Sequence, residues 1–421
     1  MLHILSRLLP VRCACIALLA LTAGCTSVPK NPASQPAAAI CRDPATDIPA
    51  LTMCTPLEPT PSASPVLPIN YANNLKPATW PELPGWLEDS AGEAFAAFLR
   101  SCFALKARPE WRTVCTDAAA LTARDETALR QFFESRFTPH TVVNPDGSLT
   151  GTVTGYYEPI MRGSRRQTTQ FRFPIYGVPD DLLIVDLTEV YPELKNLRLR
   201  GRVDGRRVVP YYTRAEIESG KGAGGRELMW VDDAVDLFFL QIQGSGKIVL
   251  DNGEITRVSY ADQNGHQYRS IGRLLVERGE LTLDQASLQG IKAWGSRFPE
   301  KLPELLNSNA SYVFFREQPA DEAGPNGALT VPLTPGRSIA VDPRAVPLGA
   351  PVYLSTTWPN TSTPLNRLTV AQDTGGAIKG AVRADFFWGT GEDAGAQAGR
   401  MRQSGRLWVL LPNGFPLSAA N

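Results

Sequence analysis

The sequence predicts an α+β fold that is mainly β, with sheets closed into barrels and not doubly wound. Through the long central part of the 421-residue chain, short β-branched and aromatic segments follow one another, separated by Gly, Pro and Asn-Gly turns. Few crossover helices interrupt these strands, and much of the helical spacing lies toward the flanks. Roughly 330 residues follow the N-terminal region, more than one hydrophobic core usually serves, so two domains are expected.

Residues 1–24 have the pattern of a secretory signal peptide, with arginines before an apolar run that is too short to span a bilayer. The run ends in Leu-Thr-Ala-Gly before Cys25, which is the pattern of a bacterial lipoprotein cleavage site. Cys25 is then the lipidated N-terminus, and acyl chains anchor the protein. Thr26 in place of an aspartate favours the outer membrane of a Gram-negative host. The alternative is an ordinary signal with a chance cysteine.

The segment 25–75 is rich in Pro, Ala, Ser and Thr and is expected to be an unfolded tether. Four cysteines remain after the signal peptide and Cys25, and the periplasm permits two disulfides among them. Of three possible connectivities, the simplest joins Cys41 to Cys54 and Cys102 to Cys115. Neither pair has the short spacing of a structural zinc site.

Charge and histidine content exclude several kinds of function. Lys+Arg and Asp+Glu both total 42, so the formal net charge is zero and no basic field favours nucleic acid. Only His140 and His266 lie beyond the signal peptide. A histidine-based metal site or a Ser-His-Asp triad therefore has little material, and neither a metal nor another cofactor is expected.

Periodicity and turn residues predict the individual elements. Helices are expected at 91–105, 126–137, 232–241, 271–278 and 283–298. Strands are expected at 152–159, 171–178, 247–250, 255–260 and around Val352 and Leu368. The Asn252-Gly253 pair predicts a type I′ hairpin turn.

A glycine-rich stretch follows the helix expected at 232–241. Gln243-Gly-Ser-Gly-Lys lacks the frame of a nucleophile elbow and the ending of a phosphate loop. We interpret it as a turn where Gly244 and Ser245 let a flat ligand approach the backbone, while Gln241 and Gln243 offer amides. A plain structural turn is the alternative.

Three aspartates, Asp342, Asp373 and Asp385, recur beside turns near the C-terminus. Asp373 precedes a Thr-Gly-Gly bend, and Asp385 lies next to the aromatic run Phe386–Trp388. Packing against aromatic side chains raises the pKa of an acid, as a general acid at neutral pH requires. From local residues alone, an aspartate near a glycine is more often a turn cap.

These segments resemble a known family when they are taken in order. The C-terminal segments resemble the three-aspartate domain; they are Val341-Asp-Pro with Pro347-Leu-Gly, residues 373–380 and Asp385. Further segments extend the resemblance to the membrane-bound lytic murein transglycosylase A family over about 151–412; they lie at 154–159, 236–246, 263–272 and 311–315. The resemblance implies a double-psi β-barrel catalytic domain at 76–148 plus 307–421 and a second β-barrel domain inserted at 149–306. A groove between them would hold the glycan.

The resemblance implies cleavage of the β-1,4 bond between MurNAc and GlcNAc in peptidoglycan, with a 1,6-anhydro-MurNAc end as product. Asp385 is the implied single acid/base. We assign Asp373 to orienting support, with a structural turn as the alternative. Two rivals stay open: a hydrolase in which Asp373 or Glu158 activates water, and a lipoprotein that binds glycan without cleaving it. Cell-wall synthases or hydrolases are possible partners.

Candidate contacts to the glycan come from the same motifs: Tyr156, Tyr157, Gln241, Gln243, Gly244, Ser245, Asn264, Gly265, Gly375, Gly376 and Lys379. The two tyrosines should face opposite sides of one strand. Lys379 is a candidate for a lactyl or peptide carboxylate, or is a surface charge. Glu158 precedes a proline and is expected at a solvated strand end. Asp262 stands where the family usually has a small residue.

Overall fold

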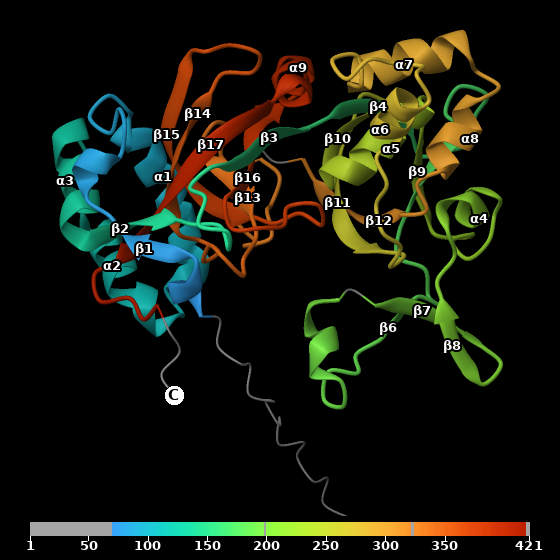
Figure 1. Cartoon of the computed structure of the whole chain (residues 1–421). Coiled ribbons are helices and arrows are strands. Elements are labelled where there is room, and N and C mark those ends of the chain that lie inside the picture. The colour runs from blue at the N-terminus through green and yellow to red at the C-terminus, as the bar shows by residue number, and fades with distance from the viewer. Residues whose placement is uncertain (1–69, 198, 321–323, 418–421) are drawn as a thin grey trace, which may run out of the picture. The chain divides into compact units, whose positions relative to one another are not determined.

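The computed structural model describes residues 70–197, 199–320 and 324–417. The predictions for the signal peptide, Cys25, the tether up to residue 69 and the Cys41–Cys54 pair fall outside these residues. The described residues form three sheets and nine α-helices, which confirms an α+β fold that is mainly β (Figure 1). None of the helices in these ranges is both long enough and apolar enough to cross a bilayer.

The larger sheet has eight strands in the order β1-β2-β17-β14-β15-β13-β16-β3. Their bounds are β1 Leu75–Pro77, β2 Phe137–Val142, β3 Gly151–Glu158, β13 Ser338–Val341, β14 Pro351–Thr357, β15 Pro364–Asp373, β16 Arg383–Thr390 and β17 Arg402–Pro412. An additional pairing joins β17 to β3. Six strands thereby close into a ring, which leaves them without a free edge. The double-psi topology stays a prediction.

The second sheet has six strands in the order β12-β11-β10-β4-β9-β5. Their bounds are β4 Ile160–Ser164, β5 Phe173–Tyr176, β9 Glu227–Val231, β10 Ser245–Leu250, β11 Ile255–Gln263 and β12 Val313–Pro319. In the described residues its ladder ends at β12 and β5, so this sheet is open in its hydrogen bonding where the resemblance implied a barrel. A third sheet holds β6 Leu183–Ile184, β7 Arg200–Asp204 and β8 Arg207–Pro210.

The helices lie mostly where helical spacing predicts them. They are α1 Ala91–Leu105, α2 Pro109–Ala120, α3 Glu126–Arg136, α4 Arg214–Glu218, α5 Ala234–Gln243, α6 Ile271–Glu277, α7 Leu288–Arg297, α8 Leu302–Asn307 and α9 Glu392–Arg400. The first three gather on one side of the larger sheet (Figure 1). Helix α2 was not predicted, although Pro109 at its first position and the buried Trp111, Val114 and Ala118 carry a helical pattern.

A disulfide between Cys102 and Cys115 joins α1 to α2, with the Cα atoms 5.4 Å apart. This confirms the pairing that sequence proximity favoured. Replacing both cysteines by serine should lower the free energy of unfolding by about 3 kcal/mol, because the open chain regains loop entropy when it unfolds. Urea denaturation with and without reductant measures this. An unchanged midpoint in the double variant would contradict the expectation.

Two local details differ from the sequence predictions. Helix α7 begins at Leu288 and not at residue 283, because the Ser287 hydroxyl caps it by accepting the N–H of Gly290 at 3.2 Å. In the β10–β11 hairpin Gly253 has a φ of +84°, whereas Asn252 is not in the left-handed region. The turn is therefore a type I turn followed by a left-handed glycine, and the predicted type I′ turn is wrong.

Alternation along the barrel strands separates a core face from a polar face. Val153, Ala384 and Phe386 belong to the main hydrophobic core that the ring of strands and α1–α3 share. Thr154 and Asp385 alternate with them and so project from the other face. Thr154 and Asp385 are thus held on a rigid support while the opposite face is packed.

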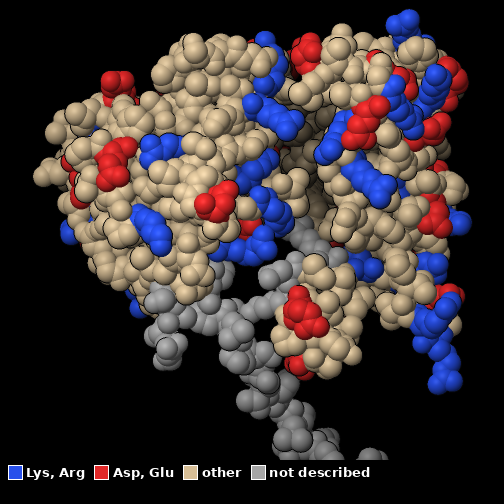
Figure 2. Space-filling model, in the orientation of Figure 1, with Lys and Arg blue, Asp and Glu red and all other residues tan. Residues whose placement is uncertain are grey.

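Charges of both signs are interspersed over the face of the molecule in view, and much of that face is uncharged (Figure 2). This agrees with the formal net charge of zero. Neither sign covers the whole face as an extended field.

Candidate active site

One transverse row of residues crosses five neighbouring strands of the barrel. Ala340 on β13 is paired with Asp373 on β15 and with Asp385 on β16. Asp385 is paired with Thr154 on β3, which is in turn opposite Arg402 on β17. Asp373 and Asp385 therefore lie two strand spacings apart, about 10 Å between their backbones. Residues that are 12 positions apart in the chain meet here through strand pairing.

Asp385 lies partly exposed on this row and is held by a short hydrogen bond. The Thr154 hydroxyl donates to its Oδ1 at 2.5 Å. Burial among protein atoms raises the pKa of Asp385, while the Thr154 hydrogen bond and the charge of Arg383 lower it only in part. The raised pKa is what a general acid needs. Of the neighbouring aromatic residues, Phe386 belongs to the core on the opposite face, whereas Phe387 clusters with Tyr156 and Ala340, the strand partner of Asp385.

The Asp373 carboxyl group accepts hydrogen bonds from three donors. Its Oδ1 accepts the backbone N–H groups of Ala328 at 2.8 Å and Thr374 at 2.9 Å. Its Oδ2 accepts the Tyr156 hydroxyl at 3.1 Å. Burial raises the pKa of Asp373 to about 6 in spite of these donors, and the charge of Asp385 adds to the rise. The two carboxyl groups are therefore close enough to influence each other.

The raised pKa of Asp373 has a consequence for stability. Its folded value of about 6 lies above the ordinary 3.8, so the folded state prefers the protonated acid. The cost to folding grows as pH rises from about 4 to 6 and stays above that. Asp373→Asn should therefore unfold less readily than wild type at pH 8, by on the order of 2 kcal/mol, with the gain fading below pH 4. Urea midpoints at both pH values test this, and a loss of stability at pH 8 would refute it.

Arg383 and Thr154 form the side of the site next to Asp385. The Nη2 of Arg383 donates to the Thr154 hydroxyl at 2.9 Å, and this hydroxyl in turn donates a hydrogen bond to Asp385. The Nη1 of Arg383 donates to the carbonyls of Thr152 and Ala384. Burial lowers the pKa of Arg383, and the charge of Arg402 lowers it further, while the charge of Asp385 opposes both. These contacts fix the orientation of the Asp385 carboxyl group.

The loop between β15 and β16 contains Gly375, Gly376 and Lys379, of which Gly376 and Lys379 are exposed. Asp342, the third aspartate, holds this loop because its Oδ2 accepts the N–H of Gly380 at 3.0 Å. Burial alone would raise the pKa of Asp342, but the hydrogen bonds from Arg344 and Gly380 outweigh it and bring the pKa to about 2. Asp342 is therefore a structural residue, and the loop it anchors lies directly after Asp373.

Tyr156 and Tyr157 project from opposite faces of β3, as alternation predicts. Tyr156 joins a small cluster with Phe387 and donates to Asp373, so it belongs to the site. Tyr157 packs against α9, where Gly395 leaves room for its ring. A Cβ on Gly395 would lie 2.8 Å from that ring.

A glycine-rich turn follows α5 as predicted, but the side-chain oxygens of Gln241 and Gln243 already accept hydrogen bonds within the protein. Gly244 ends the helix with a φ of +82°, and Ser245 begins β10. The Gln243 Oε1 accepts the backbone N–H of Tyr157 at 3.1 Å, which ties the turn to β3. The Gln241 side chain is buried and accepts a hydrogen bond from Arg214. Gln241 therefore has a structural role in this conformation.

Asn264 is likewise committed to the fold. Its Nδ2 donates to the carbonyls of Tyr212 and Ala310, both at 2.8 Å, and its Oδ1 accepts the N–H of Tyr312 at 2.9 Å. The side chain is 1% exposed, so the structure places it away from any solvent-borne ligand. Gly265 beside it is exposed with a φ of +83°.

Asp262, the departure noted in the sequence, is paired with Arg200 on β7 at 2.8 Å. Its Oδ1 also accepts the N–H of Gln263 at 2.8 Å. A Cβ on Gly265 would lie 2.9 Å from the Cβ of Arg200. This aspartate thus fastens β7 against the loop that follows β11.

The position of Glu158 differs from the sequence prediction. It is fully buried and not at a solvated strand end. Its Oε1 accepts the Nε of Arg257 at 2.7 Å, and its Oε2 accepts the Thr390 hydroxyl at 2.9 Å. A buried charge persists only when it is paired in this way. Glu158 therefore links β3, β11 and the end of β16, and water does not reach it as a catalytic base would require.

Within the part of the chain that the structure describes, no group of three or more His, Cys, Asp or Glu side chains is arranged to hold a metal ion. Sequence reasoning did not single out Thr154, Arg383 or Arg402 as site residues. Thr154 and Arg383 lay within the motifs, but only strand register shows that they meet Asp385. Arg402 carries no local signal at all.

Two family models match the chain. The MltA specific insert domain matches residues 152–316, and the 3D domain matches residues 337–411. The second match contains the whole Asp373–Ala340–Asp385 part of the row. These two matches define a protein that combines a three-aspartate domain with a transglycosylase-type insert.

Curated relatives and solved structures agree with these two family matches. Membrane-bound lytic murein transglycosylase A of Escherichia coli strain K12 is 35% identical over 264 residues, which span 61% of this chain and 64% of that relative. MltA from Neisseria gonorrhoeae is 41% identical with a TM-score of 0.71, covering 82% of this chain and 94% of that one. E. coli MltA with bound chitohexaose is 28% identical with a TM-score of 0.58, covering 80% and 91%. The chain belongs to the membrane-bound lytic murein transglycosylase A family.

Proposed function

We propose that this protein is a peptidoglycan lytic transglycosylase with Asp385 as its acid/base. It cleaves the β-1,4 bond between MurNAc and GlcNAc and leaves a 1,6-anhydro-MurNAc end. The observation that carries the proposal is a partly exposed aspartic acid with a raised pKa, fixed by Thr154 on a rigid barrel. Family membership supports the substrate, and one relative was solved with a chitooligosaccharide bound.

In the proposed reaction Asp385 starts protonated. It donates its proton to the glycosidic oxygen as the bond from C1 of MurNAc to that oxygen breaks, and GlcNAc leaves as an alcohol. The resulting carboxylate then takes the proton from the O6 hydroxyl of the same MurNAc while O6 bonds to C1. Asp385 ends protonated again, and no water is consumed. Because attacker and target belong to one sugar, effective molarity replaces the second carboxylate of ordinary glycosidases.

Asp373 supports this step as a positioning residue. Its oxygens accept three hydrogen bonds, which leaves it poorly placed to take a proton from water. As an anion at neutral pH it stands near the developing positive charge of the sugar, and through Tyr156 it orders the cluster beside Asp385. Glu158 is paired with Arg257 and takes no part. A hydrolytic mechanism that needs a free second carboxylate is thus less supported.

The glycan is proposed to run along the polar face of the row. The loop with Gly375, Gly376 and Lys379 and the turn at Gly244 and Ser245 are proposed to contact it. Tyr156, Gln243 and Gly265 are further proposed contacts, whereas Tyr157 is not carried forward because it packs against α9 on the opposite face of β3. Gln241 and Asn264 are not carried forward, because their amides are buried and already bonded.

The remaining architecture is also a proposal. We propose a double-psi barrel as catalytic domain with an inserted second domain. Strand pairing supports moving the insert boundaries expected at 149 and 306, because β3 pairs within the barrel and β12 pairs within the six-stranded sheet. We further propose a lipid anchor at Cys25 and a position on the periplasmic face of the outer membrane. Cell-wall synthases or hydrolases are the proposed partners there.

The test is release of soluble fragments from purified sacculi by the purified protein. Wild type should lower sacculus turbidity steadily. A protein that only binds glycan would sediment with sacculi and leave the turbidity unchanged, which would overturn the proposal.

A further inference from the structure

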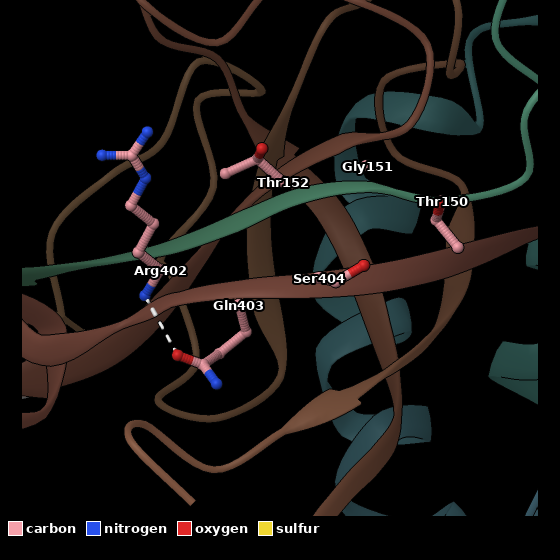
Figure 3. Close-up of a pocket in the computed structure, with 6 residues that line it drawn as sticks. All are labelled: Thr150, Gly151, Thr152, Arg402, Gln403 and Ser404. Carbon is pink, nitrogen blue, oxygen red and sulfur yellow. Dashed lines mark hydrogen bonds between the residues drawn. The ribbon is translucent and has the colours of Figure 1, made fainter. Parts of the chain in front are cut away.

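A cavity of about 280 Å³ opens between the first residues of β3 and β17. Its lining residues are Thr150, Gly151, Thr152, Arg402, Gln403 and Ser404. Figure 3 shows the side chains of Arg402 and Thr152 extending to the same side of the two strands, while Gln403 extends to the other. The volume is near the lower end of ordinary ligand pockets, about 300 Å³.

Strand register places this cavity at the flank of the active site. Arg402 is opposite Thr154, and Ser404 is opposite Thr152. Thr154 is the residue that donates to Asp385. On the next strand Arg383 donates to the Thr152 carbonyl at 3.3 Å. A group in the cavity would therefore be one strand away from the catalytic acid.

The lining of the cavity includes one cation, Arg402, and neither an Asp nor a Glu. Arg402 is exposed, and among the described residues neither it nor Arg383 forms an ion pair with an Asp or Glu side chain. The two guanidinium groups are near enough that the charge of Arg402 lowers the pKa of Arg383. An exposed arginine in the lining, with a second positive charge nearby, indicates a site for a negative ligand.

We propose that this cavity is a subsite for a carboxylate on the peptide branch of the MurNAc residue, bound by Arg402 with the Thr152 and Ser404 hydroxyls as further donors and with the charge of Arg383 nearby. The inference rests on the proposed function and names the form of the polymer that the enzyme prefers: strands that still bear peptides. Arginine suits the task because its planar fork pairs with both oxygens of a carboxylate.

Binding of that carboxylate also acts on catalysis. Its negative charge offsets part of the positive charge of Arg383, which lowers the pKa of Asp385. An acid relieved of a nearby positive charge holds its proton more firmly at neutral pH. Peptide-bearing strands should therefore be bound more tightly and also find the acid in its working form.

The test compares two substrates: murein glycan strands with intact peptides, and the same strands after an amidase has removed the peptides. Wild type should show a higher kcat/KM on the peptide-bearing strands. Arg402→Gln should reduce the ratio of the two kcat/KM values by about 10-fold, as expected for the loss of a charge-assisted hydrogen bond. Salt should reduce the ratio in wild type as well.

Arg112→Gln, which removes an exposed arginine from α2, is the matched control and should keep the wild-type ratio. If Arg402→Gln keeps the wild-type ratio too, the subsite is wrong even though the enzyme is a transglycosylase. If free phosphate lowers activity on both substrates equally, the arginines bind anions without selecting the peptide branch, and the proposal also fails. If wild type cleaves neither substrate, the proposed function itself falls.

Discussion

Asp385→Asn should abolish the release of soluble fragments from sacculi, with a rate at least about 10³-fold below wild type. The amide has the shape of the carboxyl group and still accepts the Thr154 hydrogen bond, but it has no acidic proton for the leaving oxygen. It also cannot take the O6 proton afterwards. Turbidity of sacculi and the yield of soluble glycan measure the loss.

Two measurements on the same variant separate chemistry from folding. Burial raises the pKa of Asp385, so its ionised form opposes folding at neutral pH, and the amide should leave the protein at least as stable as wild type. Cosedimentation with sacculi should also persist. A variant that is folded, binds and remains active would remove Asp385 from the mechanism.

Thr154→Val should reduce kcat by about 10- to 100-fold, because a misplaced catalytic group loses much of its advantage. Valine keeps the shape of threonine but offers no hydroxyl to orient Asp385 or to receive Arg383. Loss of that donor also removes an influence that lowers the pKa of Asp385. The alkaline limb of the pH–rate profile should therefore shift to higher pH.

Thr138→Val on β2 is the matched control, since Thr138 is also a strand threonine that donates to one side-chain oxygen, that of Asn413 at 2.9 Å. It should leave both the rate and the pH profile unchanged. If Thr154→Val reduced the rate without moving the alkaline limb, its part in tuning Asp385 would be wrong, and only a packing role would be left.

Local sequence predicted much of the fold because local physics determines those parts. Apolar spacing in 91–105 and 126–137 is enough to define α1 and α3, and residue alternation is enough to define β3. The type I′ turn predicted at Asn252 was wrong because a type I turn followed by the left-handed Gly253 connects the two strands equally well. The position of Glu158 failed because its partner Arg257 comes from a distant strand.

The candidate site was likewise predictable from local sequence only in part. Asp385 and Asp373 were found through the order of motifs, and Tyr156 through alternation. The transverse row that joins them to Thr154 and Arg402 depends on which strands pair and in which register. A shift of one residue would turn Asp385 into the core. Register is a property of the folded barrel, so no local pattern in the sequence contained it.

The central claim is that one acid, Asp385, cuts the strand without water. Mass spectrometry of the fragments that wild type releases from murein in ¹⁸O-labelled water tests it most directly. The account predicts MurNAc ends whose mass is lower by one water than a reducing end, and no incorporated label. Labelled reducing ends would contradict it and would show that a second group, with Asp373 the nearest candidate, activates water.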